Sequence, residues 1–233
     1  MRIAEGEHVA VLGPNGSGKS SFIKAITREC YPLQGSTVRI LGKERWNIFD
    51  LRSQLGIVTN DLMLACSRDY TGRETVLSGF FSSVGLWPYH LVTPEMEEKA
   101  DRIIRFLDVE HLQLRNVSEM SSGEARRFLV GRALVHDPQT LIFDEPTNSL
   151  DLHAMRMLHI AMRQIAQAGK SIVLVTHTLQ DIIPEISRVV MIQQGQVFFD
   201  GPKEEALTAS RLSLLFGSPV EIAVRNDVFH ALY

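Results

Sequence analysis

The sequence predicts an α/β fold with a mostly parallel sheet. Short strand-like runs alternate with helical patterns near both ends of the 233-residue chain, and 45% of its residues are hydrophobic, which is enough for a buried core. Between Thr71 and Leu134 the strand signal disappears. Alternating strands and helices favour a parallel sheet covered by helices. We therefore expect one domain, residues 1–233, with a helical subdomain, residues 61–134, inserted in it.

The first elements follow this alternation. A strand is expected at His8–Leu12, where an apolar run leads into a glycine-rich turn. A helix should follow from about Ser20 to Arg28. Two further strands are expected at Ser36–Leu41 and Ile57–Thr59.

Three helices are expected in the middle of the chain. The first spans the apolar segment Glu74–Leu86. The second begins at Thr93, whose hydroxyl is suited to cap a helix that opens with proline and glutamate, and apolar residues then recur at helical spacing. The third follows Ser121 and ends near Val135.

The alternation returns after residue 139. The expected elements are a strand at Thr140–Phe143, a helix at Leu152–Ala168, a strand at Ser171–Thr176, a hairpin of Val189–Gln193 with Gln196–Phe199, and a short helix after Pro202. Gly169 ends the long helix, and Gln194-Gly195 is the hairpin turn.

Composition argues against several classes of protein. The chain has 24 Lys and Arg against 27 Asp and Glu, a net charge of −3, so non-specific binding to nucleic acid is not expected, and Arg126 and Arg127 are expected on a solvated helix face. Two cysteines, Cys30 and Cys66, fit a reduced cytoplasmic setting. No run approaches the ~20 apolar residues that cross a bilayer, so a membrane role would require a membrane-spanning partner.

A glycine-rich segment between a predicted strand and a predicted helix is the strongest functional signal. It reads Gly13-Pro14-Asn15-Gly16-Ser17-Gly18-Lys19-Ser20 and matches the pattern G-x-x-x-x-G-K-[ST]. Glycines let backbone N–H groups converge on phosphate oxygens, while the helix that follows directs its positive end at the same anion. Lys19 supplies a charge for the terminal phosphates, and the Ser20 hydroxyl can bind Mg²⁺. These eight residues and Ser21 form the candidate nucleotide site; the alternative is an ordinary glycine turn.

Two acidic residues end the strand predicted at Thr140–Phe143. At the carboxyl end of a central strand they would lie where open α/β sheets bind ligands. Asp144 suits the Mg²⁺ shell, and Glu145 suits a general base that activates the attacking water. The alternative is a strand followed by a solvated acidic turn, which the nearby phosphate loop disfavours.

Four further segments resemble the ATP-binding subunit of ABC transporters. Met120-Ser121-Ser122-Gly123-Glu124 resembles the signature L-S-G-G-Q, Asp144-Glu145-Pro146-Thr147 the end of the Walker B strand, Asn148-Ser149-Leu150-Asp151 the D-loop, and His177 the switch histidine. The resemblance spans nearly the whole chain and implies a P-loop NTPase fold with a partial antiparallel β subdomain, and ATP hydrolysis. More weakly, Thr75–Trp87 and Leu215–Val220 resemble importer ATPases for metal chelates, iron complexes or molybdate.

The resemblance also implies partners. In the family the signature contacts the γ-phosphate of ATP bound to the opposite subunit, so Ser121, Gly123 and Glu124 are implied to bind nucleotide, and His177 is implied to contact the γ-phosphate. A homodimer that closes around two ATP molecules follows from this arrangement. An integral membrane permease would hold the subunit on the inner face of the cell membrane.

Three departures from the family pattern affect these expectations. Asn60 stands where the family has the Mg²⁺-binding Gln, and it keeps the amide oxygen on a shorter side chain. Ser122 and Glu124 replace a glycine and the glutamine of the signature, and we expect both changes to be tolerated. The first twelve residues contain no Phe, Trp or Tyr to stack on adenine, and the two leading strands of the β subdomain are absent. Because such stacking contributes ~1–3 kcal/mol, weak ATP binding is expected.

An apolar cluster in the helical region is either the core of that subdomain or a permease contact. Its members are Leu62, Met63, Val76, Leu77, Phe80, Phe81, Leu86 and Trp87, of which Trp87 and Phe81 are the better contact candidates. Two alternatives to a transport ATPase are a soluble cassette ATPase in nucleic-acid repair or translation, and a P-loop kinase or GTPase. The lack of sustained heptads argues against the first, and the signature and His177 argue against the second.

Overall fold

The computed structural model describes residues 1–32, 37–62 and 70–232 and groups the chain into two compact units. The first unit joins Met1–Arg52 to the chain from Ser171 onward, and the second comprises Ser53–Lys170. The predicted insertion, residues 61–134, lies within the second unit but does not share its boundaries, and it stays a prediction. Met63 and Cys66 lie outside the described residues.

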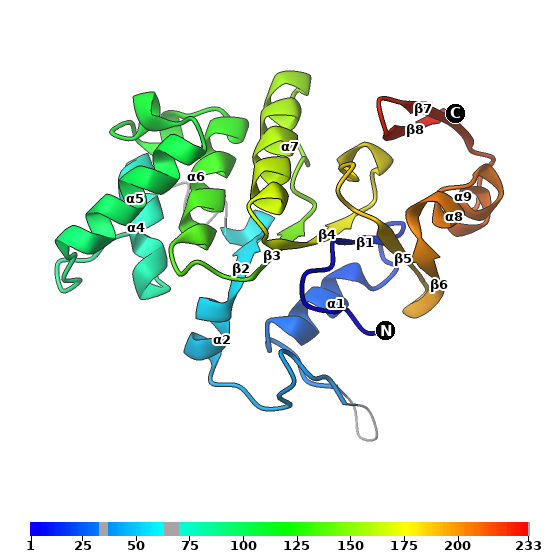
Figure 1. The fold of residues 1–233 in the computed structure, drawn as a ribbon, viewed down its shortest axis with the longest axis horizontal. Helices are drawn as coiled ribbons and strands as arrows, with labels where there is room; N and C mark the ends of the chain where they lie inside the picture. Colours follow the sequence, from blue (N-terminus) through cyan, green and yellow to red (C-terminus); the bar gives the residue numbers. More distant parts are fainter. Residues whose placement is uncertain (33–36, 63–69, 233) are drawn as a thin grey trace. The chain divides into compact units, whose positions relative to one another are not determined.

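The first unit is built on four adjacent strands (Figure 1). In spatial order they are β4 (Ser171–Thr176), β1 (Val9–Leu12), β5 (Arg188–Gln193) and β6 (Gln196–Pro202). β1 pairs in parallel with β4 and β5, and β6 runs antiparallel to β5. Every residue of β1 and β4 is buried, which explains why both strands are continuous apolar runs.

The helices of the first unit lie close to strand ends in the sequence. They are α1 (Lys19–Ile26), η4 (Leu179–Asp181), α8 (Lys203–Ala206) and α9 (Ala209–Phe216). Thr208 caps α9 through its side chain, and Gly217 ends it in the left-handed conformation that glycine adopts without strain. The predicted short helix after Pro202 is therefore confirmed, as two pieces.

The strand predicted at Ser36–Leu41 is wrong over its described part. Within residues 37–41 only Ile40 takes part in a bridge, an isolated one with Lys43, and Ser36 lies outside the described residues. The buried guanidinium of Arg28 holds this segment instead, because its Nη2 donates to the carbonyl oxygens of Val38 and Glu44 at 2.8 Å each. A single buried arginine thus satisfies carbonyls that a strand ladder would otherwise pair.

Two elements of the structure lie outside the predictions from sequence. They are the helix α2 (Ile48–Gln54) and a C-terminal hairpin of β7 (Glu221–Arg225) with β8 (Val228–Leu232). Asn226 and Asp227 form the hairpin turn with φ of 52° and 59°. Positive φ at both central residues matches the turn type that two-residue hairpins favour.

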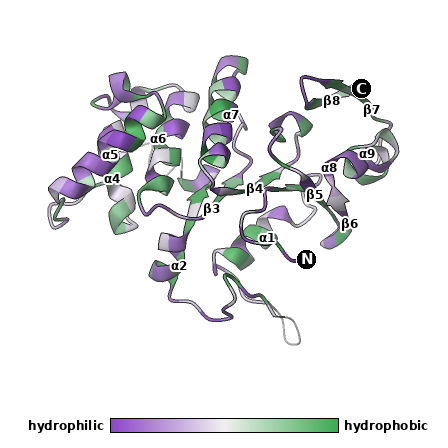
Figure 2. Ribbon diagram, viewed as in Figure 1, coloured by the Kyte–Doolittle hydropathy of each residue, from purple (hydrophilic) through white to green (hydrophobic). Residues whose placement is uncertain are grey.

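The second unit combines a parallel strand pair with packed helices. The strands are β2 (Leu55–Val58) and β3 (Thr140–Asp144), and the α-helices are α4 (Gly72–Ser78), α5 (Pro94–Phe106), α6 (Ser122–Leu134) and α7 (Leu152–Gln167). α4, α5 and α6 pack on one another, and α6 also packs on α7 and β2. α5 is largely hydrophilic, and of its residues only Ala100 and Ile104 are buried (Figure 2).

Several predictions for this unit are confirmed. No strand lies between Thr71 and Leu134, a stretch that the structure describes throughout. Three short 3₁₀ helices complete it, namely η1 (Gly79–Phe81), η2 (Glu110–Leu112) and η3 (Val117–Glu119). Thr93 and Ser121 cap their helices as expected. The helix predicted at Glu74–Leu86 ends early, because the chain turns through positive φ at Ser82 and Gly85.

Among the described helices, none is both long and apolar enough to cross a bilayer. The α/β class, with mostly parallel strands and additional antiparallel pairing in the two hairpins, is confirmed.

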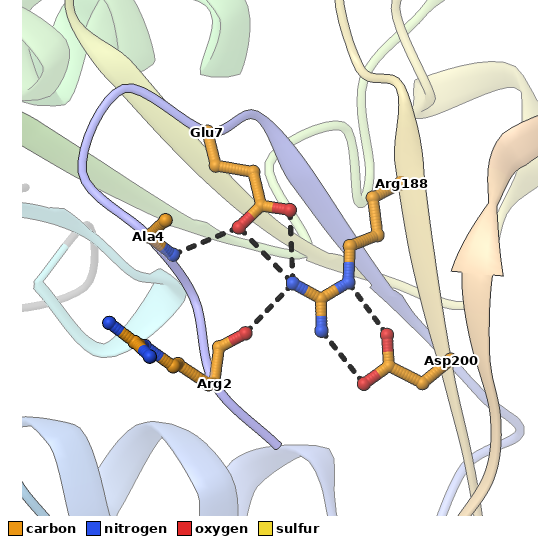
Figure 3. Close-up of polar contacts among 5 residues, drawn as sticks. All are labelled: Arg2, Ala4, Glu7, Arg188 and Asp200. Carbon is orange, nitrogen blue, oxygen red and sulfur yellow. Dashed lines mark hydrogen bonds and ion pairs between the residues drawn. The ribbon is translucent and has the colours of Figure 1, made fainter.

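A salt-bridge cluster fastens the N-terminal segment to the sheet of the first unit (Figure 3). Arg188 on β5 makes a bidentate contact with Asp200 on β6, at 2.6 and 2.8 Å. Its Nη1 also donates to the Glu7 carboxylate at 2.9 Å and to the carbonyl oxygen of Arg2 at 2.8 Å. The cluster therefore joins the segment before β1 to two strands.

The same contacts lower the pKa values of both carboxylates. For Asp200 the hydrogen bonds from Arg188 are the main cause. For Glu7, partial burial raises the pKa, but hydrogen bonds from the Ala4 amide and from Arg188 outweigh it. Because the folded pKa values lie below the unfolded ones, the stabilisation is present above the unfolded values and is lost as pH falls through the folded ones.

Arg188→Gln should lower the free energy of unfolding by about 2 kcal/mol at pH 7, since it removes charged hydrogen bonds from a half-buried site. The difference from the wild type should shrink as the pH falls below about 4, where the carboxylates of the unfolded chain take up protons, and should be lost as the pH falls through the lower folded-state pKa values. Denaturant unfolding at several pH values measures this. The exposed Arg39–Glu44 pair supplies the control, and Arg39→Gln should change stability by less than about 0.5 kcal/mol. A pH-independent Arg188 effect would contradict the account.

Candidate functional site

The glycine-rich loop connects β1 to α1, as predicted. Gly16 and Gly18 have φ of 76° and 108°, a region where side chains are strained. A Cβ atom on Gly13 would lie 2.4 Å from the carbonyl oxygen of Ile192, and one on Gly18 would lie 3.3 Å from the Cα of Gly195. The loop thus packs against β5 and the turn that follows it, and its backbone path requires glycine.

The polar groups of this loop fit a phosphate ligand. The Lys19 side chain is buried, and its Nζ donates to the carbonyl oxygens of Gly13 and Pro14 at 2.8 and 3.1 Å, so the ammonium lies across the loop. The Ser17 Oγ is buried and has no hydrogen-bond partner among the described residues. No side chain caps the start of α1 at Gly18, which leaves its first-turn N–H groups for an anion.

His177 is placed at the same edge of the sheet as the glycine-rich loop. Thr176 at the end of β4 is in register with Leu12 at the end of β1, so Gly13 and His177 each follow directly after a paired residue. The turn at His177 is fixed by the buried Thr176 hydroxyl, which donates to Asp181 at 2.7 Å and accepts from the Thr178 amide at 3.0 Å. The structure therefore brings two of the predicted site elements together in the first unit.

The second unit repeats this arrangement with acidic and amide side chains. Val58 of β2 is in register with Phe143 of β3, so Asn60 and the pair Asp144 and Glu145 follow the carboxyl ends of neighbouring strands. Glu145 has a φ of 45°, a conformation that is strained for a residue with a side chain. Such outliers concentrate at functional sites, which supports the predicted role of this glutamate.

The predicted signature segment begins α6 with a reciprocal cap. The Ser121 Oγ accepts from the Glu124 amide at 3.3 Å, and the Glu124 carboxylate accepts from the Ser121 amide at 2.8 Å and from its hydroxyl at 2.9 Å. The pKa of Glu124 is lowered, chiefly by the hydrogen bond from the Ser121 amide. At neutral pH this position therefore carries a charge that the family glutamine lacks.

The signature segment and the D-loop form one exposed corner of the second unit. The Ser122 hydroxyl donates to the carbonyl oxygen of Ser149 at 3.4 Å, and Asp151 caps α7 through the Ala154 amide at 2.7 Å. The residues on this exposed corner are Ser121, Ser122, Asn148, Ser149, Asp151 and Leu152, and Leu152 is 82% exposed. A single exposed apolar side chain is common on protein surfaces, so the polar loop residues and the capped helix start define this corner.

Arg126 and Arg127 contradict the prediction that they lie on a solvated helix face, since they are only 5% and 9% exposed. The carbonyl oxygens of Leu107 and Asp108 accept hydrogen bonds from Arg127. Arg126 donates to the carbonyl oxygens of Glu145 and Pro146 and to the Oδ1 of Asn60. Backbone carbonyls distant in sequence accept the hydrogen bonds of both guanidinium groups, and no local sequence pattern indicates this burial.

Comparison with known proteins agrees with these observations. The family described as ABC transporter matches residues 1–148 of the chain. The chain is 31% identical over 231 residues to the uncharacterized ABC transporter ATP-binding protein YlmA of Bacillus subtilis (strain 168), covering 97% of this chain and 86% of that protein. It is 32% identical over 226 residues to the hemin import ATP-binding protein HmuV of Nocardia farcinica, covering 94% and 75% respectively.

Other similar proteins include an export ATP-binding protein and a chain from a solved transporter structure. The Nod factor export ATP-binding protein I of Rhizobium johnstonii is 30% identical over 226 residues, covering 95% of this chain and 70% of that protein. A chain from an inward-facing metal-chelate type ABC transporter superposes with a TM-score of 0.78 at 22% identity, covering 100% of this chain and 89% of that chain. This likeness confirms the fold.

The fold and the phosphate loop define a P-loop NTPase. The chain belongs to the ABC transporter family, as an ATP-binding and ATP-hydrolysing subunit that powers transport. These relatives do not support the soluble ATPase or the kinase and GTPase alternatives.

Gly123→Ala should destabilise the protein, because a Cβ atom at this position would lie 2.3 Å from the Cβ of Ala154. Overpacking of this kind costs about 1–3 kcal/mol in the free energy of unfolding, which denaturant titration measures. The neighbouring exposed change Ser122→Ala is the control and should cost less than about 0.5 kcal/mol. Equal stability of Gly123→Ala and the wild type would show that α6 and α7 do not approach this closely.

Proposed function

We propose that two copies of this chain bind ATP between them, hydrolyse it and then separate, and that this cycle drives a membrane permease. The observation that carries the proposal is the exposed corner of Ser121, the D-loop and Leu152. It presents the capped start of α6 and the exposed residues of the D-loop to solvent, where a second copy can reach them. In a dimer with two-fold symmetry, the exposed corner of each copy would contact the nucleotide bound by the other copy.

The phosphate loop and its neighbours are the proposed nucleotide site of each copy. Lys19 and the backbone amides of the loop bind the terminal phosphates, and His177 contacts the γ-phosphate. Ser20 and Asp144 supply oxygen ligands of the kind that Mg²⁺ prefers, and the metal would neutralise charge on the phosphates. Glu145 accepts a proton from the attacking water and orients it.

Hydrolysis then reverses dimer closure. A γ-phosphate that contacts both the loop of one copy and the Ser121 corner of the other holds the two together. Cleavage removes that shared contact, so the closed dimer loses its main interaction. The charge on Glu124 weakens the contact relative to a neutral glutamine, since it adds a carboxylate near the phosphate.

An exposed loop after η1 supports a permease contact on the second unit. Trp87, Tyr89 and Leu91 are 46%, 75% and 82% exposed, and the His90 ring stacks on Phe81 at 4.2 Å between centroids. By contrast Val76 and Leu77, from the same predicted cluster, belong to the core. We infer that this loop receives a cytoplasmic segment of an integral membrane permease, which would hold the subunit at the inner face of the membrane.

Glu145→Gln should preserve ATP binding, stop hydrolysis and trap a dimer, because it removes the base and leaves the phosphate contacts in place. Size-exclusion chromatography with ATP and Mg²⁺ should show a species of twice the monomer mass. Lys19→Ala is the control and should lose ATP binding and remain monomeric, because the ammonium of the loop is gone. Hydrolysis by Glu145→Gln at the wild-type rate would remove Glu145 from its proposed role.

Trp87→Ala combined with Tyr89→Ala should weaken association with the permease by at least about tenfold, since buried aromatic residues dominate such interfaces. Co-purification from detergent extracts of cells that express the chain and its permease measures this. Leu114→Ala is the matched control, because Leu114 is 79% exposed in the same unit but outside the loop. Equal recovery of permease with both variants would place the contact elsewhere.

A further inference from the structure

We propose that Arg126 is a positioning residue that holds the backbone of Glu145, and that Asn60 serves as its side-chain anchor instead of binding Mg²⁺. The inference rests on the proposed role of Glu145 as the base. It assigns functions to Arg126 and Asn60 that the family resemblance does not supply.

Arg126 connects three segments of the second unit through one guanidinium group. Its Nη1 donates to the carbonyl oxygen of Pro146 at 2.7 Å and to that of Glu145 at 3.2 Å. Its Nη2 donates to the Oδ1 of Asn60 at 2.7 Å. The planar group carries donors in a fixed geometry, so these bonds constrain α6, the segment after β2 and the segment after β3 together.

The hydrogen bonds from Arg126 act on a residue whose backbone conformation is strained. Glu145 adopts a φ of 45°, which is unfavourable for a residue with a side chain and persists only if its surroundings enforce it. The carbonyl of Glu145 belongs to the peptide that joins it to Pro146, and the carbonyl of Pro146 belongs to the next peptide, so Arg126 holds two consecutive peptide planes. The direction in which the Glu145 carboxylate leaves the backbone depends on the first of these planes.

The contact also changes the role open to Asn60. Arginine remains protonated in proteins, and here its charge lies 2.7 Å from the amide oxygen that would bind the metal. A cation at this distance opposes the approach of a divalent cation to the same oxygen. The Asn60 side chain is therefore assigned to the hydrogen bond with Arg126. Ser20 and Asp144 remain as the proposed metal ligands.

The bond network also links the base to the signature corner. Arg126 lies five positions after Ser121 on the same helix start, and α6 is continuous between them. The position of Ser121 and the backbone of Glu145 are therefore fixed relative to each other within one unit.

The variants Arg126→Gln and Asn60→Ala test the proposal in the full chain. Each should lower kcat for ATP hydrolysis by about 10- to 100-fold, with KM within about threefold, because a small displacement of a catalytic group has effects of this size. Arg126→Lys should recover part of the lost rate, since it keeps a buried cation and one donor direction. Binding of a fluorescent ATP analogue should stay within about threefold of wild type for all three.

Arg127→Gln is the matched control. Arg127 is equally buried on the same helix and also donates to backbone carbonyls, but those carbonyls belong to Leu107 and Asp108. Its replacement should lower the thermal midpoint and leave kcat within about twofold. If the role of Arg126 were purely structural, Arg126→Gln would give the same result, with a lower thermal midpoint and an unchanged kcat. Unchanged kcat in Arg126→Gln therefore overturns the proposal. If that variant fails to fold, the kcat of Asn60→Ala, at a half-buried position, serves instead, and an unchanged kcat again overturns the proposal.

The Mg²⁺ dependence and the double variant separate an anchor from a metal ligand. For an anchor, Asn60→Ala should leave the Mg²⁺ concentration for half-maximal rate unchanged and should add little to Arg126→Gln, because both remove one interaction. A raised Mg²⁺ requirement with additive losses would make Asn60 a metal ligand and overturn this part. Absence of ATP hydrolysis by the wild type, or full activity of Glu145→Gln, would instead refute the proposed function. Normal results for those two proteins with a fully active Arg126→Gln would refute this inference alone.

Discussion

The path of the glycine-rich loop at residues 13–18, whose backbone amides are proposed to bind phosphate, is the constraint on which the rest of the structure depends. The loop can follow its path only because Gly13 and Gly18 bring it against β5 and its following turn without a side chain. The register of β1 with β5 therefore determines where the loop lies, and the four consecutive apolar residues of each strand are buried. The sheet is in this sense a support for one short glycine-rich segment.

The remaining site residues follow from the same geometric rule. Parallel strands end at a common edge, so side chains just beyond neighbouring strands lie close together. In the first unit the rule groups Gly13 with His177, and in the second it groups Asn60 with Asp144 and Glu145. The first unit thus contains the backbone amides that are proposed to bind an anion. The second unit contains the carboxylate and amide oxygens.

Much of the fold could be predicted from local sequence, because the strands are apolar runs and the helices carry their caps. The signals at β1, β3, Thr93 and Ser121 all act over a few residues, and these predictions are confirmed. The Asn226-Asp227 pair is a similar local signal, because both residues tolerate the positive φ that the turn of the C-terminal hairpin requires.

The errors share a different physical origin. Arg28, Arg126 and Arg127 are hydrophilic in sequence but buried, because carbonyls far along the chain accept their hydrogen bonds. Such pairing cannot be read from a local pattern, and it replaced a predicted strand in one place and a predicted solvated face in another.

The central claim is that one ATP is held by the phosphate loop of one copy and the Ser121 corner of another. Mixing two inactive variants tests it most directly. Lys19→Ala removes the loop ammonium, and Ser121→Asp keeps a helix cap while opposing the phosphate with a carboxylate. Each alone should hydrolyse almost no ATP, whereas an equimolar mixture should regain up to about half of the wild-type rate, since each mixed pair contains one intact site out of two. A mixture no more active than its components would contradict the account.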